Sequence, residues 1–146
     1  MQTRMTRIDF YFNVDHKLRQ VAELAMLALP RQRHLFVFTP DAAVADQLEA
    51  VLWTRTPTSF LPHCRAGHRL AAETPIVIDW SEAAPPYDDV LVNLRPEQPP
   101  FFSRFRSLIE VVGQEQEDRE AARARFRFYR DRGYEIRSHD VAGGRA

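Results

Sequence analysis

The chain has 146 residues, of which 45% are hydrophobic and 27% are charged, a length and composition typical of one globular domain. Its 20 basic residues balance 20 acidic ones, which argues against a protein that binds polyanions with its whole surface. A single cysteine excludes an internal disulfide. The sequence has neither a membrane-spanning apolar run nor a signal-peptide core, so we expect a cytoplasmic protein that does not bind membranes.

The first third of the chain predicts two strand–helix units. Residues 8–12 are aromatic and β-prone, and residues 18–29 place apolar side chains at helical spacing, with Asp15 as the expected cap. Residues 35–38 form a continuous apolar run, as expected of a strand buried on both faces. Asp41 is then expected to cap a second helix.

The middle of the chain is irregular up to residue 72 and then alternates again. Residues 76–78 and 90–94 predict two buried strands separated by a proline-rich turn, and residues 101–105 predict a short helical segment. Residues 108–112 predict another strand.

The C-terminal part contains the longest predicted helix, residues 115–132, followed by Gly133 and a strand at 134–136. Strands that alternate with helices predict a single three-layer, Rossmann-like α/β domain over residues 1–140. Its sheet is mainly parallel and has helices on both faces. Residues 141–146 are predicted to be a frayed tail.

The sequence lacks the motifs of nucleotide and metal chemistry. No glycine follows the first predicted strand, so a pyrophosphate could not approach the backbone in the usual way, and we expect no cofactor. His63, Cys64 and His68 supply three zinc-type ligands where a structural site needs four, and a loop without metal is the favoured alternative. The same His and Cys side chains lack an orienting partner for catalysis, so we expect no active site.

Two surfaces carry more information. On the long helix, Arg119, Arg123, Arg127 and Arg130 fall on one stripe, flanked by Phe126, while Ala121, Ala124 and Phe128 are spaced to face the sheet.

Such a stripe suits an acidic peptide with an apolar end or single-stranded nucleic acid, unless it is an ordinary solvated face with Phe126 in the core. The second surface lies around a proline-bearing turn bracketed by Trp53 and Phe60. Exposed aromatic anchors there would form an interface, and packing over the sheet edge is the alternative.

These segments resemble the chi subunit family of bacterial DNA polymerase III. The similarity runs from about residue 8 to residue 136, and its most specific part is the Leu-Trp pair at 52–53 followed by Ser-Phe-Leu-Pro-His at 59–63. Further matching stretches are residues 75–80, 89–95 and 122–130. The family pattern has tyrosine at Phe126 and lysine at Arg119 and Arg127.

The resemblance implies a non-catalytic adaptor with two binding sites. The first, at Arg119, Arg123, Phe126 and Arg127, would bind the acidic C-terminal tail of single-stranded DNA-binding protein. The second, at Trp53, Phe60, Pro62 and His63, would bind the psi subunit of the clamp loader or an alternative helicase partner. It further implies a monomer that forms a heterodimer with psi and contacts DNA only indirectly.

The charge distribution agrees with a compact acidic ligand. Residues 1–118 contain 12 basic and 16 acidic residues, a net charge of −4, whereas residues 119–146 contain 8 and 4, a net charge of +4. The formal zero is therefore a cancellation between an acidic body and a basic C-terminal end. A module that binds single-stranded nucleic acid directly through the same helix is the alternative function.

Overall fold

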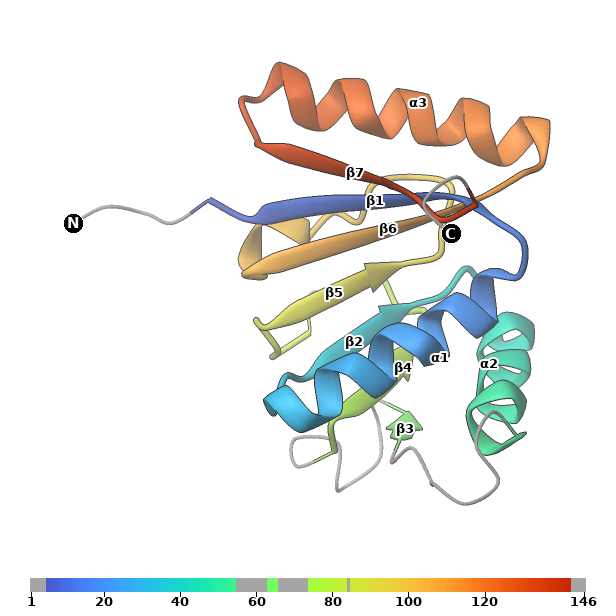
Figure 1. Ribbon diagram of the computed structural model, residues 1–146. Coiled ribbons are helices and arrows are strands. Elements are labelled where there is room, and N and C mark those ends of the chain that lie inside the picture. The colour runs from blue at the N-terminus through green and yellow to red at the C-terminus, as the bar shows by residue number, and fades with distance from the viewer. Residues whose placement is uncertain (1–4, 55–62, 66–73, 84, 143–146) are drawn as a thin grey trace.

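Seven strands of the described residues form one parallel sheet (Figure 1). The computed structural model describes residues 5–54, 63–65, 74–83 and 85–142. The strand order is β3-β4-β2-β5-β6-β1-β7. The strands are β1 (Arg7–Val14), β2 (Leu35–Phe38), β3 (His63–Arg65), β4 (Ile76–Asp79), β5 (Val90–Asn93), β6 (Ser107–Gly113) and β7 (Ile136–Asp140).

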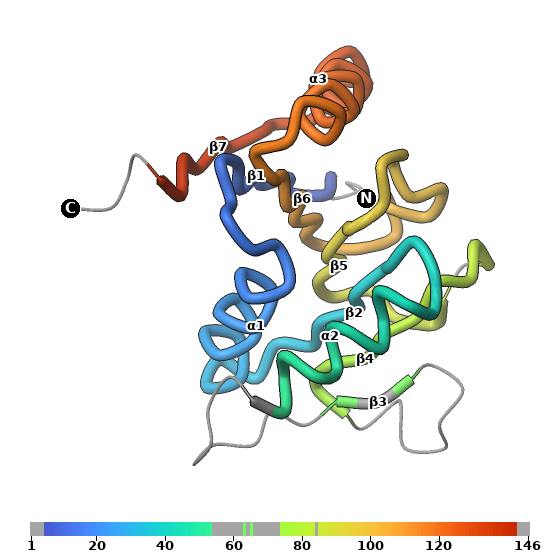
Figure 2. The backbone as a smooth tube through the Cα atoms, turned by 90° about the vertical axis from the view of Figure 1, so that its right-hand side faces the viewer, coloured from blue at the N-terminus to red at the C-terminus, as the bar shows by residue number. Residues whose placement is uncertain are grey.

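Helices cover both faces of this sheet. The helix α1 (Lys17–Ala28), which continues into the short 3-10 helix η1 (Leu29–Arg31), and α2 (Ala42–Thr54) pack on one face. On the other face lie α3 (Gln116–Asp131) and the short η3 (Phe102–Arg104). Figure 2, which faces the carboxyl ends of the strands, shows α1 and α3 on opposite sides. The predicted three-layer α/β architecture is confirmed.

Alternation along the strands divides the core in two. In β2, Leu35 and Val37 pack against α1 and α2, whereas Phe36 and Phe38 pack on the α3 side. The α3 side is the aromatic one, and three of its rings come from the segment around η3: Phe101, Phe102 and Phe105. This aromatic layer supports α3.

The N-terminal ends of α1 and α2 can be compared with the two capping residues predicted from the sequence. Asp41 is confirmed as a cap, because its carboxylate accepts a hydrogen bond from the backbone N–H of Val44 at 3.0 Å. Asp15 as a cap is wrong. The N-cap of α1 is His16, which makes no side-chain capping bond, and Asp15 accepts a hydrogen bond from Gln114 at 2.8 Å instead.

Two strands differ from the prediction. β3 was not predicted, because three residues are too few to show a period and it pairs with β4 alone. The last strand begins at Ile136 rather than at residue 134, and it continues through Asp140 beside β1. The backbone N–H of Val141 then bonds the carbonyl of Phe12 at 3.0 Å. Residues 143–146 of the predicted frayed tail lie outside the described residues.

Candidate protein-binding surfaces

Asp118 fixes the N-terminal end of α3. Its carboxylate accepts a 2.6 Å hydrogen bond from the backbone N–H of Gly113, the last residue of β6, and forms a 3.1 Å ion pair with Lys17 of α1. A Cβ at position 113 would lie 3.2 Å from this carboxylate, so glycine allows the close approach. An acidic side chain in the first turn also complements the helix dipole. The start of α3 is thereby joined to the sheet and to α1.

A buried polar network lies under the middle of α3. The carboxylate of Glu110, on β6, accepts hydrogen bonds from Arg125 Nε at 2.9 Å, from the Tyr129 hydroxyl at 2.6 Å and from Asn93 Nδ2 at 3.0 Å. Arg125 also donates to the carbonyl of Pro96 at 2.7 Å. Arg125 is 2% exposed and Glu110 is fully buried.

The network settles which face of α3 points inward. Ala122, Arg125 and Tyr129 are buried, whereas Ala124 is exposed, and Ala121 and Phe128 are only half-buried. The prediction that Ala124 faces the sheet is therefore wrong, whereas Phe128 packs against Phe102 with 6.1 Å between ring centroids and is only partly covered. Apolar spacing alone had favoured those positions, but a buried carboxylate under the helix requires donors above it.

Burial governs the ionisation of the network. Burial raises the pKa of Glu110, and the charge of Arg125 and the hydrogen bonds from Tyr129 and Asn93 oppose that rise. Burial also raises the pKa of the Tyr129 phenol far above its ordinary value, and the adjacent Glu110 carboxyl adds to the effect. The phenol is therefore fixed as a hydrogen-bond donor.

The outer face of α3 displays three arginines, Arg119, Arg123 and Arg127, which we call the arginine row. All three are exposed, and none forms an ion pair with a described residue. Arg130 leaves this set because its guanidinium pairs with Asp131 at 3.3 Å. The row follows i, i+4, i+8 spacing and spans about 12 Å along the helix axis.

Phe126 lies beside the arginine row and is half-buried. Its ring packs against Phe10 of β1, with 5.4 Å between ring centroids. The side chain is thus held by the core on one side and accessible on the other. This is intermediate between the core and surface alternatives drawn from the sequence.

The groove at the N-terminal end of α3 has the opposite charge. Its lining includes Glu115, Glu117 and Asp118, and Lys17, which also lines it, is already paired with Asp118. An acidic ligand would be repelled there. The arginine row and this groove therefore divide α3 into a basic outer face and an acidic start.

The second predicted surface is described only in part. Trp53, at the end of α2, is 63% exposed, and its ring lies 6.1 Å from that of His63 in an edge-to-face arrangement. The structure thus brings together two of the four predicted residues from separate elements. Phe60 and Pro62 lie outside the described residues.

Ion pairs anchor this second surface to the sheet. Arg65 of β3 pairs with Asp46 at 2.6 Å and Glu49 at 2.9 Å, both on α2, and its guanidinium lies 5.2 Å from the centre of the Trp80 ring. β3 is therefore fastened to α2 beside Trp53.

Comparisons with known proteins show to which family the chain is similar. Residues 5–137 match the family described as DNA polymerase III chi subunit, HolC. The chain belongs to this family. It is 33% identical to the DNA polymerase III subunit chi of Pseudomonas aeruginosa, over 92% of this chain and 96% of that protein. The subunits chi of Escherichia coli K12 (27% identity, 80% of each chain) and Haemophilus influenzae (31%, 75% and 76%) are also similar.

Membership of the chi family makes the chain an accessory subunit of the DNA polymerase III holoenzyme with a role in DNA replication. Within the part of the chain that the structure describes, no group of three or more His, Cys, Asp or Glu side chains could hold a metal ion. His68, from the zinc alternative, lies outside that part. No described helix is long and apolar enough to cross a membrane.

The Glu110 network was not predicted from the sequence, although one signal was present. Glu110 interrupts the apolar run of residues 108–112, and a carboxylate inside a buried strand needs partners. The partners are Asn93, which lies 17 residues before Glu110 in the chain, and Arg125, which lies 15 residues after it. A pattern read along the chain does not pair such residues.

Proposed function

We propose that this chi-family chain is a non-catalytic adaptor of the clamp-loader complex. In this proposal it binds the acidic C-terminal tail of single-stranded DNA-binding protein and links it to the clamp loader through psi. The observation that carries the proposal is the arginine row beside the half-exposed ring of Phe126.

The arginine row supplies charge complementary to an acidic tail. An extended peptide advances about 3.3 Å per residue, so the 12 Å of the row match roughly four residues of tail. Guanidinium groups hold carboxylates through paired N–H donors, and the three side chains have no competing described partner.

Phe126 supplies the apolar half of the site. The terminal phenylalanine of the tail would pack against the accessible side of this ring, and its carboxylate would pair with a neighbouring guanidinium. The buried Arg125–Glu110 pair keeps α3 in register with the sheet, so the helix backbone that carries the arginine row is already in place before the tail binds.

The surface at Trp53 and His63, completed by Phe60 and Pro62, is proposed to bind psi or an alternative helicase partner. A 63% exposed tryptophan held edge-to-face against a neighbouring ring is a rigid aromatic anchor, as binding hot spots often are. The two surfaces lie on different elements, α3 and the α2–β3 region, so one chain can bind both partners at once.

The test is a titration of a labelled tail peptide against the wild type and Arg123→Ala. Loss of one charge-assisted contact on an exposed helix should weaken binding about five- to tenfold, roughly 1–1.4 kcal/mol. Arg137→Ala is the matched control, because Arg137 is an exposed arginine on β7. Equal affinities of the wild type and Arg123→Ala would contradict the site.

Direct binding of single-stranded nucleic acid is the second candidate, because phosphates could pair with the same arginine row. A mobility-shift experiment with a bare oligonucleotide separates the two. The adaptor predicts little retention, whereas the alternative predicts retention that Arg123→Ala abolishes.

A further inference from the structure

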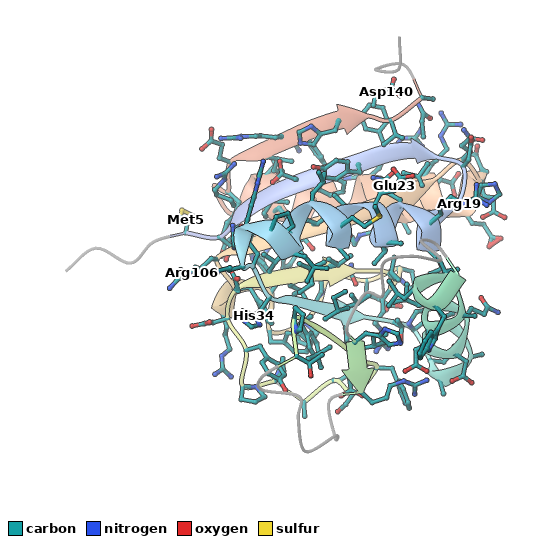
Figure 3. The ribbon with its side chains drawn as sticks, turned by 60° about the horizontal axis from the view of Figure 1, so that its bottom comes forward. Met5, Arg19, Glu23, His34, Arg106 and Asp140 are labelled. Carbon is teal, nitrogen blue, oxygen red and sulfur yellow. The ribbon has the colours of Figure 1, made fainter. Side chains whose placement is uncertain are left out.

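We propose that the chain has a second docking groove, between α1 and the strands β1 and β6, for an acidic peptide segment that carries a large apolar side chain. The groove lies on the sheet face opposite α3 and shares no residue with the two surfaces above. Figure 3 shows α1 in front of the sheet, with no described helix over β1 and β7 on this side.

The wall and floor of the groove are apolar. Leu24 and Leu27 enter from α1, Ile109 comes from β6, and Tyr11 from β1. Leu27 is 63% exposed, although it belongs to an otherwise amphipathic helix, and the adjacent Met26 is also exposed. Large aliphatic side chains left open beside a concave surface are typical of protein-interaction sites.

The rim of the groove is basic. Three guanidiniums line it, and those of Arg7 and Arg31 form no ion pair with a described residue. Arg33 is held by Asp89, whose carboxylate accepts hydrogen bonds from the Arg33 Nε at 2.9 Å and from a terminal guanidinium nitrogen at 2.6 Å. Asp9 is the acidic side chain in the lining, and its carboxylate is paired with His139 at 2.8 Å.

Apart from Arg33, which pairs with Asp89, the lining carries two cations, Arg7 and Arg31, that have no ion-pair partner among the described residues and lie beside an apolar floor. A partner that neutralises Arg7 and Arg31 must be acidic, and one that covers Leu27 and Ile109 must also be apolar. A peptide segment combines the two properties, since carboxylates and a leucine- or phenylalanine-sized side chain can lie on adjacent residues.

Size and ring geometry favour a peptide over other ligand classes. The cavity volume is about 250 Å³, below the roughly 300–1,000 Å³ typical of small-molecule and cofactor sites, and it suits one or two side chains. Nucleic acid would need an open ring face for stacking. Here one face of Tyr11 is covered by His139, with 4.5 Å between ring centroids.

The experiment is a titration followed by residue-resolved NMR. The probe is an amidated peptide, Asp-Glu-Asp-Leu-Glu-Leu-Asp, which lacks the terminal carboxylate proposed to bind at α3. We expect saturable shifts of the Leu27 and Ile109 methyl signals. Arg7→Glu combined with Arg31→Glu should weaken this binding at least tenfold. Both residues are exposed, so the fold should persist, and circular dichroism checks it.

Two control variants make the result specific. Arg104→Glu reverses an exposed charge on η3, across the sheet, and Arg123→Glu disables the proposed tail site. Both should leave the Leu27 and Ile109 shifts within twofold of the wild-type affinity.

Three outcomes would overturn the proposal. The first is shifts confined to α3, and the second is groove affinity unchanged by the double charge reversal. The third is stronger shifts of Leu27 and Ile109 with an oligothymidine than with the peptide. The Leu27 and Ile109 signals are separate from those of α3. Failure of the groove proposal therefore leaves the tail-binding proposal unaffected, and failure of the tail-binding proposal leaves the groove proposal unaffected.

Discussion

Glu110 brings a carboxylate into the middle of β6, where no water reaches it, and four side-chain donor contacts surround it. A buried ion pair of this kind adds little net stability compared with an apolar pair. Removal of one residue of the pair lowers the free energy of unfolding strongly, however, because the remaining buried charge is left without a partner. The intact pair therefore fixes the position of α3 more than it adds to total stability, whereas removal of one partner is strongly destabilising.

We predict that Glu110→Ala lowers the free energy of unfolding by about 3–5 kcal/mol, because it leaves the Arg125 guanidinium buried and unpaired. Glu97→Ala is the matched control, since the Glu97 carboxylate is 70% exposed and its ion pair with Arg95 is long, at 3.9 Å. That change should cost less than about 0.5 kcal/mol. Urea unfolding of both variants measures the difference, and equal losses would show that the network is not structural.

The Tyr129 phenol gives the protein a pH dependence of known sign. Its pKa is raised in the folded state from the ordinary 10.0, so the unfolded chain releases this proton at a lower pH than the folded protein does. The stability gained is complete below pH 10 and is lost as the pH rises above it.

We therefore expect the melting temperature to fall as the pH rises above about 10, and to fall less steeply in Tyr129→Phe, which has no phenol to titrate. Thermal unfolding followed between pH 8 and 11, as an approximate range, checks the slope. Identical slopes in the wild type and the variant would rule out Tyr129 as the cause.

At the scale of elements, the two sides of α3 have different roles: one side anchors the helix to the sheet and the other faces solvent. One side of the helix inserts Ala122, Arg125 and Tyr129 into the sheet, and the other side presents the arginine row. The period and the ends of this helix could be predicted from the sequence, because they depend on neighbours along the chain. The inward face could not, since Glu110 and Asn93 of the sheet select it.

Asp118 should be the most sensitive contact at the start of α3. We expect Asp118→Ala to reduce the hydrogen-exchange protection of the Gly113 amide, because that buried donor loses its acceptor, a cost of about 1–3 kcal/mol. Glu115→Ala is the control, as Glu115 occupies the N-cap without a side-chain capping bond. Protection unchanged in Asp118→Ala would contradict the role of the carboxylate in fixing the helix.

At the scale of the whole molecule, the formal net charge of zero hides separated charges. Arg125 and Glu110 are buried together and cancel, so the C-terminal excess of positive charge resides on exposed arginines such as those of the arginine row. The start of the same helix is acidic. An anionic ligand is therefore directed to local basic patches, of which the outer face of α3 is one, rather than to the molecule in general.

Binding of the tail should weaken as salt rises, because exposed guanidinium–carboxylate contacts are screened over a Debye length of about 10 Å at 0.1 M salt. We expect the dissociation constant to rise several-fold between about 0.05 and 0.3 M sodium chloride, with a shallower dependence for Arg123→Ala. Fluorescence anisotropy measures both. A dependence identical in the two proteins would exclude Arg123 from the contact.

The order of the strands and helices other than β3, the parallel α/β class and the arginine row could be predicted from the sequence, because each follows from spacing between near neighbours in the chain. The tertiary structure decided the burial of Arg125, the meeting of Trp53 with His63 and the groove lined by Arg7 and Arg31. These features depend on contacts between distant segments. Whether a charged or aromatic side chain is paired, covered or free is set by what the folded sheet places beside it.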